Sequence, residues 1–260
     1  MNLNKQEILS HWYAEIYDQN VIETKDIECL LSILGAEPKR VLEVACGTGR
    51  ICVPLAKAGH IVSGFDMDEA MLLRAQCKAE FLPNLHCYHM NALVSDWGDG
   101  FEVVVMAGNL FINIVTAGDY QQAQRTFLKK AYDTLMIGGH LYLDFDCVDW
   151  PDVSADDHSE WVCFEGTDDR GTYGKFIVVS GGYSSKERKS INSIRRYEII
   201  PERGDKFSIE RVWNKYFPTL EQTCSWLYDA GFSIDRLYGS YDKQPFTPEN
   251  RRAVIWAKKV

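Results

Sequence analysis

The pattern of apolar positions between Arg40 and Asp66 predicts a strand, a glycine turn, a helix and a second strand. Val41 to Ala45 is a short apolar run, broken by a single acid, and it ends at a Gly-Thr-Gly turn. A helix-compatible segment then ends at Ala58-Gly59, and Ile61 to Phe65 forms the second apolar run. This succession over about thirty residues is typical of a β-α-β unit, and it indicates a nucleotide-type binding half.

The remaining chain divides into segments with helical spacing and segments with extended patterns. The other helices are expected at residues 5–17, 26–34, 67–80, 120–135 and 219–230, and the other core strands at 85–90, 101–106, 141–145, 233–238 and 252–258. Four further extended runs, at 161–164, 173–180, 190–200 and 208–217, interrupt this alternation and are separated by Gly, Asp and Lys clusters. We interpret these four runs as an antiparallel insert.

These elements predict an α/β fold: a doubly wound, seven-stranded, mostly parallel sheet with an antiparallel β insert that acts as a lid. The expected boundaries are an N-terminal helical cap at 1–37, a ligand-binding core at 38–150 and 217–260, and a substrate lid at 151–216. A long link with two prolines joins the last two strands of the core. That link allows those two strands to pair antiparallel.

The glycine turn narrows the ligand class. Gly47 and Gly49 have no Cβ to obstruct a ligand, and Asp66, about 20 residues after Gly47, stands where an acid accepts hydrogen bonds from ribose hydroxyls. A dinucleotide fits less well, because Cys52 takes the place of the third fingerprint glycine and the carboxylate of Glu43 would repel a pyrophosphate. An adenosine-containing, cationic ligand suits this pattern better. The alternative is that Glu43 is only an edge acid and the glycines only a turn.

The E-x-A-C-G-T-G pattern from Glu43 to Gly49 resembles the first motif of class I S-adenosylmethionine-dependent methyltransferases. The resemblance implies a methyltransferase whose cofactor, S-adenosylmethionine, carries an ammonium and a sulfonium and no phosphate. It also implies a set of cofactor-binding residues. These are Tyr17, Glu43, Ala45, Gly47, Thr48, Gly49, Asp66, Met67, Asn91, Ala92 and Met106.

Two of these residues rest on shorter matches. The Y-A-E-I-Y-D run ending at Asp18 resembles the N-terminal segment of small-molecule N-methyltransferases of the glycine and amino-sugar type, in which a tyrosine covers the cofactor. Tyr17 is the corresponding residue, unless it is an ordinary aromatic on an apolar helix face. Asn91, followed by Ala92, matches a position where the family has an acid near the adenine amine, and its amide carbonyl can still accept from that amine.

Three polar residues are expected on the methyl-acceptor side. The A-G-N-x-F segment that contains Asn109 resembles the glycine-type enzymes, which implies a substrate contact, although Asn109 could also simply form a turn. Asp144 and Asp146 fall at the end of the fifth strand, where alternation lets both point to one face. We predict Asn109, Asp144 and Asp146 as the catalytic residues, with the carboxylates orienting an amine. Either aspartate could instead cap the following turn.

Composition limits the partners. The chain has 260 residues, a net charge of −9 and a pI of about 5.2, so its field repels phosphate backbones and anionic membranes. We therefore expect a small-molecule methyl acceptor, no nucleic acid and no membrane partner, and a homodimer is left open. No run approaches eighteen apolar residues, which predicts a soluble, cytoplasmic protein. The eight cysteines include no Cys-x-x-Cys pair; we expect reduced core thiols and no metal site.

The sequence leaves several functions open. N-methylation of a small molecule by direct in-line transfer is the leading prediction, and O-methylation is the second. A protein that binds S-adenosylmethionine without catalysis is a further alternative, while Glu43 and Cys52 disfavour a nicotinamide oxidoreductase. The acceptor itself is not identified, because the resemblance does not extend across the insert, where acceptor choice is expected to reside.

Overall fold

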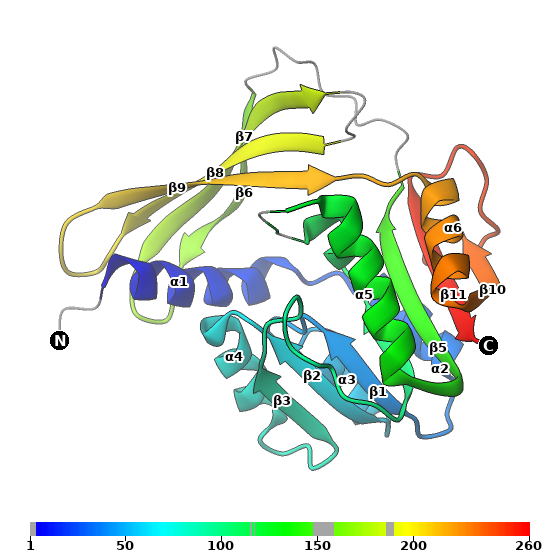
Figure 1. The fold of residues 1–260 in the computed structure, drawn as a ribbon. Coiled ribbons are helices and arrows are strands. Elements are labelled where there is room, and N and C mark those ends of the chain that lie inside the picture. The colour runs from blue at the N-terminus through cyan, green and yellow to red at the C-terminus, as the bar shows by residue number, and fades with distance from the viewer. Residues whose placement is uncertain (1–3, 115, 117, 148–158, 186–189) are drawn as a thin grey trace. The chain divides into compact units, whose positions relative to one another are not determined.

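The computed structural model describes residues 4–114, 116, 118–147, 159–185 and 190–260 (Figure 1). The chain forms two compact units: residues 1–22 with 150–216, and residues 23–149 with 217–260. This grouping separates the two N-terminal helices, α1 (Lys5–Asn20) and α2 (Lys25–Leu34), which the sequence analysis placed together in one cap. The proposed roles of cap and lid stay predictions.

The larger unit is built on a seven-stranded sheet. Its strands are β1 (Arg40–Val44), β2 (Ile61–Asp66), β3 (Leu85–His89), β4 (Phe101–Met106), β5 (Leu135–Asp146), β10 (Phe232–Tyr238) and β11 (Arg252–Lys259). They lie in the order β10-β11-β5-β4-β1-β2-β3. The pairs from β3 through to β5 are parallel, whereas β11 runs antiparallel to both of its neighbours. The predicted mostly parallel, doubly wound sheet and its antiparallel last pair are confirmed.

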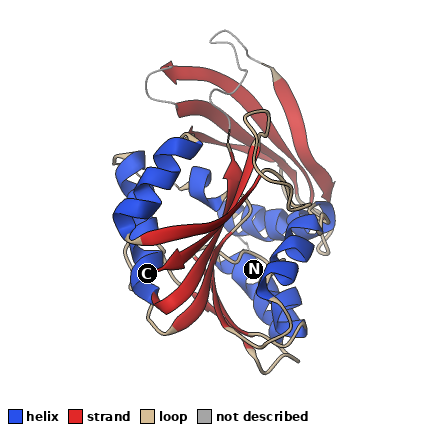
Figure 2. Ribbon diagram, turned by 90° about the vertical axis from the view of Figure 1, so that its right-hand side faces the viewer, coloured by secondary structure: helices blue, strands red, loops and turns tan. Residues whose placement is uncertain are grey.

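Helices cover both faces of this sheet, as Figure 2 shows. Besides α2, they are α3 (Cys52–Lys57), α4 (Glu69–Ala79), α5 (Tyr120–Thr134), α6 (Leu220–Ala230) and the short 3-10 helix η1 (Leu110–Asn113). The helix ends follow the capping rules used to predict them. Thr219 forms a capping box at the start of α6, and Gly231 ends that helix with a φ of 103°.

The core lies along the central strands. Val41, Val62, Val103 and Val105 belong to one buried cluster with Leu55 of α3. Strands buried on both faces need continuous apolar runs rather than alternation, and the β-branched composition of β4 meets that need. The strand ends that follow these runs are therefore held on a rigid base.

Two sequence-based expectations differ from the structure. The fifth strand was expected at 141–145, but β5 begins at Leu135, directly after α5, because the Gly138-Gly139 pair lies within the strand instead of before it. Cys77 was expected in the core with the other cysteines, but its side chain is exposed on α4. The spacing of α4 turns Cys77 away from its buried residues.

The smaller unit combines α1 with a four-stranded antiparallel sheet. The strands are β6 (Glu160–Thr167), β7 (Tyr173–Ser185), β8 (Ser190–Ile200) and β9 (Phe207–Tyr216), paired in that order. Leu9, Trp12 and Ile16 of α1 pack in one cluster with Phe176 and other apolar residues of the sheet. The Trp12 indole N–H also donates to the carbonyl of Gly166 at 3.0 Å. This packing explains why α1 belongs to the unit that contains the insert.

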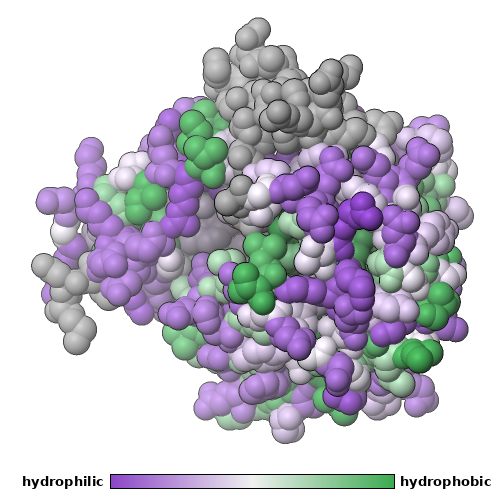
Figure 3. All heavy atoms as spheres, viewed as in Figure 1, coloured by the Kyte–Doolittle hydropathy of each residue, from purple (hydrophilic) through white to green (hydrophobic). Residues whose placement is uncertain are grey.

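One face of the molecule can be followed in Figure 3. On the face drawn in Figure 3 hydrophilic residues predominate, and the exposed apolar residues form small groups. Within the described residues, none of the helices is both long and apolar enough to cross a bilayer.

Candidate active site

The glycine turn between β1 and α3 has an unusual backbone. Ala45, Gly47 and Gly49 all have positive φ, at 56°, 54° and 83°. A Cβ on Gly49 would lie 3.1 Å from Val53 Cγ2, so packing and the positive φ both disfavour a side chain there, whereas a Cβ on Gly47 would meet nothing within 4 Å. The backbone at Gly47 is therefore open to a ligand, and a left-handed alanine in the same turn is the kind of strain that collects at functional sites.

Asp66 ends β2 and is tied to this turn. Its carboxylate accepts hydrogen bonds from the backbone N–H of Gly47 at 2.8 Å and of Asp68 at 2.9 Å. Burial raises the pKa of Asp66, and these two hydrogen bonds oppose the rise. A carboxylate offers about four acceptor positions, so lone pairs remain for the hydroxyls of a ribose. The geometry fits the role predicted for Asp66.

Glu43 lies inside the sheet, in register with Gly64 of β2 and Val105 of β4. The residue is 4% exposed, and Oε2 is buried without a hydrogen-bond partner among the described residues. Burial raises the pKa of Glu43 to about 8, against the opposing positive charge of Arg50. An unpartnered buried carboxylate oxygen is costly, and a ligand that brings a cation relieves that cost. The ammonium of S-adenosylmethionine is such a group.

Asn91 and Ala92 follow β3. The side-chain carbonyl of Asn91 accepts from the backbone N–H of Leu93 at 2.9 Å, and the carbonyl of Ala92 accepts from the Trp97 indole at 2.9 Å. An amide carbonyl has two lone pairs, so Asn91 keeps one for the adenine amine that it was predicted to contact. The local hydrogen bonds fix the turn in which both residues lie.

The other predicted cofactor residues differ in exposure. Met67 directly follows Asp66 and is 65% exposed, so an apolar side chain is available beside the acid predicted to bind the ribose. Ala45 is also exposed, whereas Thr48 and Met106 are buried. Met106 therefore belongs to the base of the site at the end of β4.

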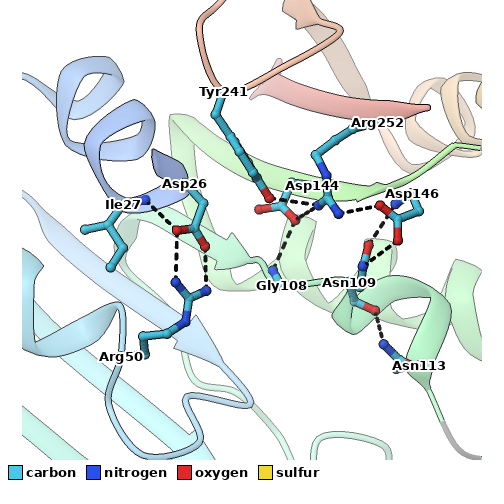
Figure 4. A network of polar contacts seen from close by, with 10 residues as sticks. All are labelled: Asp26, Ile27, Arg50, Gly108, Asn109, Asn113, Asp144, Asp146, Tyr241 and Arg252. Carbon is cyan, nitrogen blue, oxygen red and sulfur yellow. Dashed lines mark hydrogen bonds and ion pairs between the residues drawn. The ribbon is translucent and has the colours of Figure 1, made fainter. Parts of the chain in front are cut away.

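The three predicted acceptor-side residues come together at the ends of β4 and β5 (Figure 4). The Asn109 amide donates to Asp146 Oδ2 at 2.7 Å, and the backbone N–H of Asp146 donates to Asn109 Oδ1 at 2.8 Å. The backbone N–H of Gly108 donates to Asp144 Oδ1 at 3.1 Å. Asn109 adopts a φ of 65°, a conformation that asparagine tolerates better than most residues.

Arg252 joins the two aspartates. It is the cross-strand partner of Asp146, and its guanidinium forms ion pairs with Asp146 and, at 3.1 Å, with Asp144. The Arg252 guanidinium also donates to the hydroxyl of Tyr241 at 2.8 Å. Asp144 is fully buried, whereas the side chain of Asp146 is 41% exposed. Burial raises the pKa of Asp144 to about 6, and Arg252 opposes that rise.

A second ion pair lies beside this network. Arg50, in the glycine turn, donates to Asp26 of α2 at 2.9 Å, and the charge of Asp26 acts on Asp144. Asp26, Asp144 and Asp146 give three carboxylates against the two guanidiniums of Arg50 and Arg252, and Glu43 adds a carboxyl that ionises when a cation binds. This excess of negative charge suits a ligand that carries positive charges.

Tyr17 lies in the smaller unit, where its ring centroid is 6.5 Å from that of Tyr13 and 6.2 Å from that of Phe164. It therefore belongs to an aromatic cluster of α1 and β6. Its predicted role in covering the cofactor stays a prediction.

The sequence analysis missed Arg252, Arg50 and Tyr241. A signal for Arg252 existed, because an arginine that opens an antiparallel last strand can face the acids that end the neighbouring strand. No comparable pattern marks the Asp26–Arg50 pair, whose members lie in separate elements.

The fold and these residues define a Rossmann-like site for a cationic adenosyl ligand. A family described as a methyltransferase domain matches residues 41–139. A Bacillus subtilis protein, YqeM, provisionally named a methyltransferase, is 30% identical over 261 residues, which cover 95% of this chain and 96% of YqeM. The chain belongs to the class I S-adenosylmethionine-dependent methyltransferases, as its first motif predicted. It is thus a methyltransferase that uses S-adenosylmethionine.

Two solved structures show the same fold. The CcbJ methyltransferase from Streptomyces caelestis superposes with a TM-score of 0.71 at 18% identity, over 94% of this chain and 98% of CcbJ. CalS10 from Micromonospora echinaspora, an amino pentose methyltransferase described with bound S-adenosylmethionine, superposes with a TM-score of 0.62 at 16% identity, over 100% and 99%. Both are similar along almost their whole length, so the likeness includes the region of the insert.

Proposed function

We propose that this methyltransferase transfers its methyl group to a nitrogen of a small molecule, by direct in-line displacement. The proposal rests on the position and exposure of the Asp146 carboxylate. Its carboxylate is held from two sides by Asn109 and Arg252, yet remains partly exposed at the end of β5. A fixed, accessible carboxylate at the acceptor side can accept a hydrogen bond from an amine N–H and orient the nitrogen lone pair.

The cofactor residues have a separate task. When bound, S-adenosylmethionine supplies a methyl group on a positively charged sulfur. Asp66 would hold the ribose, Glu43 would face the positive charge of the amino acid portion, and the backbone at Gly47 would allow close approach. Each of these roles uses an acceptor or an opening that the structure contains. None of them requires a base.

Asp144 and Asp146 have different roles in this proposal. Asp146 touches the acceptor, while the buried Asp144 holds Arg252 and, through the N–H of Gly108, the turn before Asn109. Asp144 is therefore a positioning residue. Orientation can supply much of the acceleration, because a neutral amine is already a competent nucleophile and needs little proton removal before transfer.

An amino sugar is the first acceptor class to test. CalS10, which shares the fold along the whole chain, is an amino pentose methyltransferase. The net charge of −9 favours a small cationic or neutral acceptor over a nucleic acid or an anionic membrane. We assign acceptor choice to residues 151–216, which lie outside the matched methyltransferase family region.

The experiment combines product identification with two variants. The protein is incubated with methyl-deuterated S-adenosylmethionine and a panel of amino sugars, amino acids and phenols, and fragmentation mass spectrometry locates the label. We expect label on nitrogen. In Asp146→Asn, turnover should fall by about tenfold to a hundredfold with unchanged cofactor affinity, since a charge-assisted hydrogen bond is lost.

Asp229→Asn, which changes an exposed carboxylate on α6, is the matched control. Label on oxygen would replace the proposal with O-methylation. Wild-type turnover in a folded Asp146→Asn variant would remove Asp146 from the acceptor site.

A further inference from the structure

A second cluster of potential ligand atoms lies in the smaller unit, between α1 and the turn that joins β6 to β7. One imidazole nitrogen of His11 and one carboxylate oxygen each of Asp168 and Asp169 lie within 4.8 Å of one another. His11 Nε2 and Asp169 Oδ1 are 2.6 Å apart. All three residues belong to the same compact unit.

Asp168 has an unusual environment within this cluster. It is 6% exposed, and its Oδ1 accepts from the backbone N–H groups of Arg170 at 2.9 Å and Thr172 at 2.8 Å. Its Oδ2 is buried and has no hydrogen-bond partner among the described residues. The turn therefore accounts for the hydrogen bonds of Oδ1 but not for the burial of Oδ2. A buried carboxylate oxygen without a donor is costly, and a cation is one group that would satisfy it.

The donor set selects a class of cation. Two carboxylates and a neutral imidazole carry a charge of −2, which one divalent ion neutralises. Imidazole and carboxylate together suit borderline ions such as Zn²⁺, whereas an all-oxygen site would suit Mg²⁺. Zinc binds nitrogen and oxygen at about 2.0 to 2.2 Å, which puts the ligand atoms of a tetrahedral site roughly 3.4 Å apart. To share one ion, His11 Nε2 and Asp169 Oδ1 would separate from 2.6 Å, and any donors as far apart as 4.8 Å would approach one another.

Access is also suitable for ion loading. The side chain of Asp169 is 59% exposed and that of His11 is partly exposed, while Asp168 closes the inner side. Three protein ligands with an open outer side leave room for water as a fourth ligand.

We propose that His11, Asp168 and Asp169 form a binding site for a borderline divalent cation, with Zn²⁺ as the representative ion. The ion fastens α1 to the β6–β7 turn and so stiffens the smaller unit. The proposal is independent of the methyl acceptor and replaces the expectation, drawn from the cysteine pattern, that the chain has no metal site.

The simpler alternative is a plain His11–Asp169 ion pair. The proposed metal site and the plain ion pair differ in the role of Asp168. Only the metal site uses Asp168 as a ligand. The test is calorimetric titration of the whole chain with Zn²⁺ and, separately, Mg²⁺. A Cys77→Ser background removes the exposed thiol. Because Cys46, Cys52 and Cys87 form a second, buried group of possible zinc ligands, only the zinc binding that is lost in His11→Asn is assigned to the proposed site.

We expect one Zn²⁺ to bind per chain, more tightly than Mg²⁺, and to raise the unfolding temperature. His11→Asn and Asp168→Asn should each weaken zinc binding by about tenfold or more, since even outer partners of metal ligands have effects of that size. Asp168→Asn retains Oδ1 as the acceptor in the turn. His86→Asn, which removes an exposed histidine of the other unit, should leave zinc binding unchanged.

Absence of zinc binding in the parent chain would overturn the proposal. So would zinc affinity that is unchanged in His11→Asn. If Asp168→Asn fails to fold, as judged by circular dichroism, the His11→Asn result decides. Wild-type zinc affinity in a folded Asp168→Asn variant would show that Asp168 is not a zinc ligand, and it would also overturn the proposed three-residue site.

Discussion

The predicted cofactor side and the predicted acceptor side of the site each present two acids at or near strand ends, but they hold those acids differently. At β1 and β2, Asp66 is held by backbone N–H groups and Glu43 keeps a buried oxygen without a hydrogen-bond donor among the described residues. At β4 and β5, a single guanidinium from Arg252 binds both Asp144 and Asp146. The protein therefore supplies the cation on the acceptor side and leaves that task largely to the ligand on the cofactor side.

The largest effect is expected from removing the cation of the acceptor side. Arg252→Met leaves the fully buried Asp144 without its partner, and breaking such a pair costs about 3 kcal/mol of unfolding free energy. Urea unfolding measures it. Arg236→Met, which changes an exposed arginine of β10, should cost little. A loss in Arg252→Met no larger than that of the control would mean that Arg252 does not stabilise the acids.

On the cofactor side, Asp66→Ala should weaken S-adenosylhomocysteine binding while the fold survives. The lost charge-assisted hydrogen bonds correspond to about 1.5 to 3 kcal/mol, or roughly tenfold to 150-fold in affinity. Calorimetry measures the affinity and circular dichroism the fold. Asp99→Ala is an exposed aspartate control. Wild-type affinity in folded Asp66→Ala would exclude Asp66 as the ribose acid.

Glu43 predicts a pH effect. Its pKa of about 8 means that, below that pH, the free protein holds this carboxyl mostly protonated, whereas a bound cation favours the ionised form. Affinity for S-adenosylmethionine should therefore rise between pH 6 and 7.5, by at most about tenfold per unit, with proton release on binding. Calorimetry in two buffers of different ionisation enthalpy detects the protons. In Glu43→Gln the rise should disappear; an equal rise there would assign it to another group.

The smallest effect is expected for Asn109→Gly. Glycine keeps the left-handed backbone at this position, so the change removes only the two side-chain hydrogen bonds to Asp146. The expected cost is about 1 kcal/mol of unfolding free energy, with unchanged cofactor affinity. Thermal unfolding and calorimetry test these two expectations. A loss of cofactor affinity would show that the two sides of the site are not separate.

Local patterns were sufficient to predict most of the fold. The glycine turn, the β-branched β4 and the cap residues Thr219 and Gly231 each act within a few residues, so the sequence reveals them directly. The start of β5 was missed because Gly138-Gly139 is a common stop signal, yet here the pair continues a strand that begins at Leu135. Pairing with neighbouring strands sets the start of β5, and the periodicity of a single segment carries no information about the strands beside it.

The site residues that could be predicted are those whose place beside a strand end is visible in the local sequence. Asp66 and Asp146 end strands after apolar runs, and Glu43 interrupts such a run just before the glycine turn, so their positions alone suggest ligand contacts. Arg252 is 106 residues from Asp146 and 108 from Asp144, so only the sheet order brings them together. Likewise, the packing of Trp12 against the insert assigns α1 to the smaller unit, and helical periodicity cannot say which sheet a helix will cover.

The place of β11 between β10 and β5 has a consequence for biosynthesis. Until residues 252–259 leave the ribosome, β5 and β10 each present an unpaired edge, which is a template for aggregation. In the same interval Asp144 is without its guanidinium, so the sheet cannot yet bury it as a paired charge. A nascent chain that has emerged only as far as β10 therefore exposes both edges, and the strand that closes the sheet is also the one whose arginine pairs with Asp144 and Asp146.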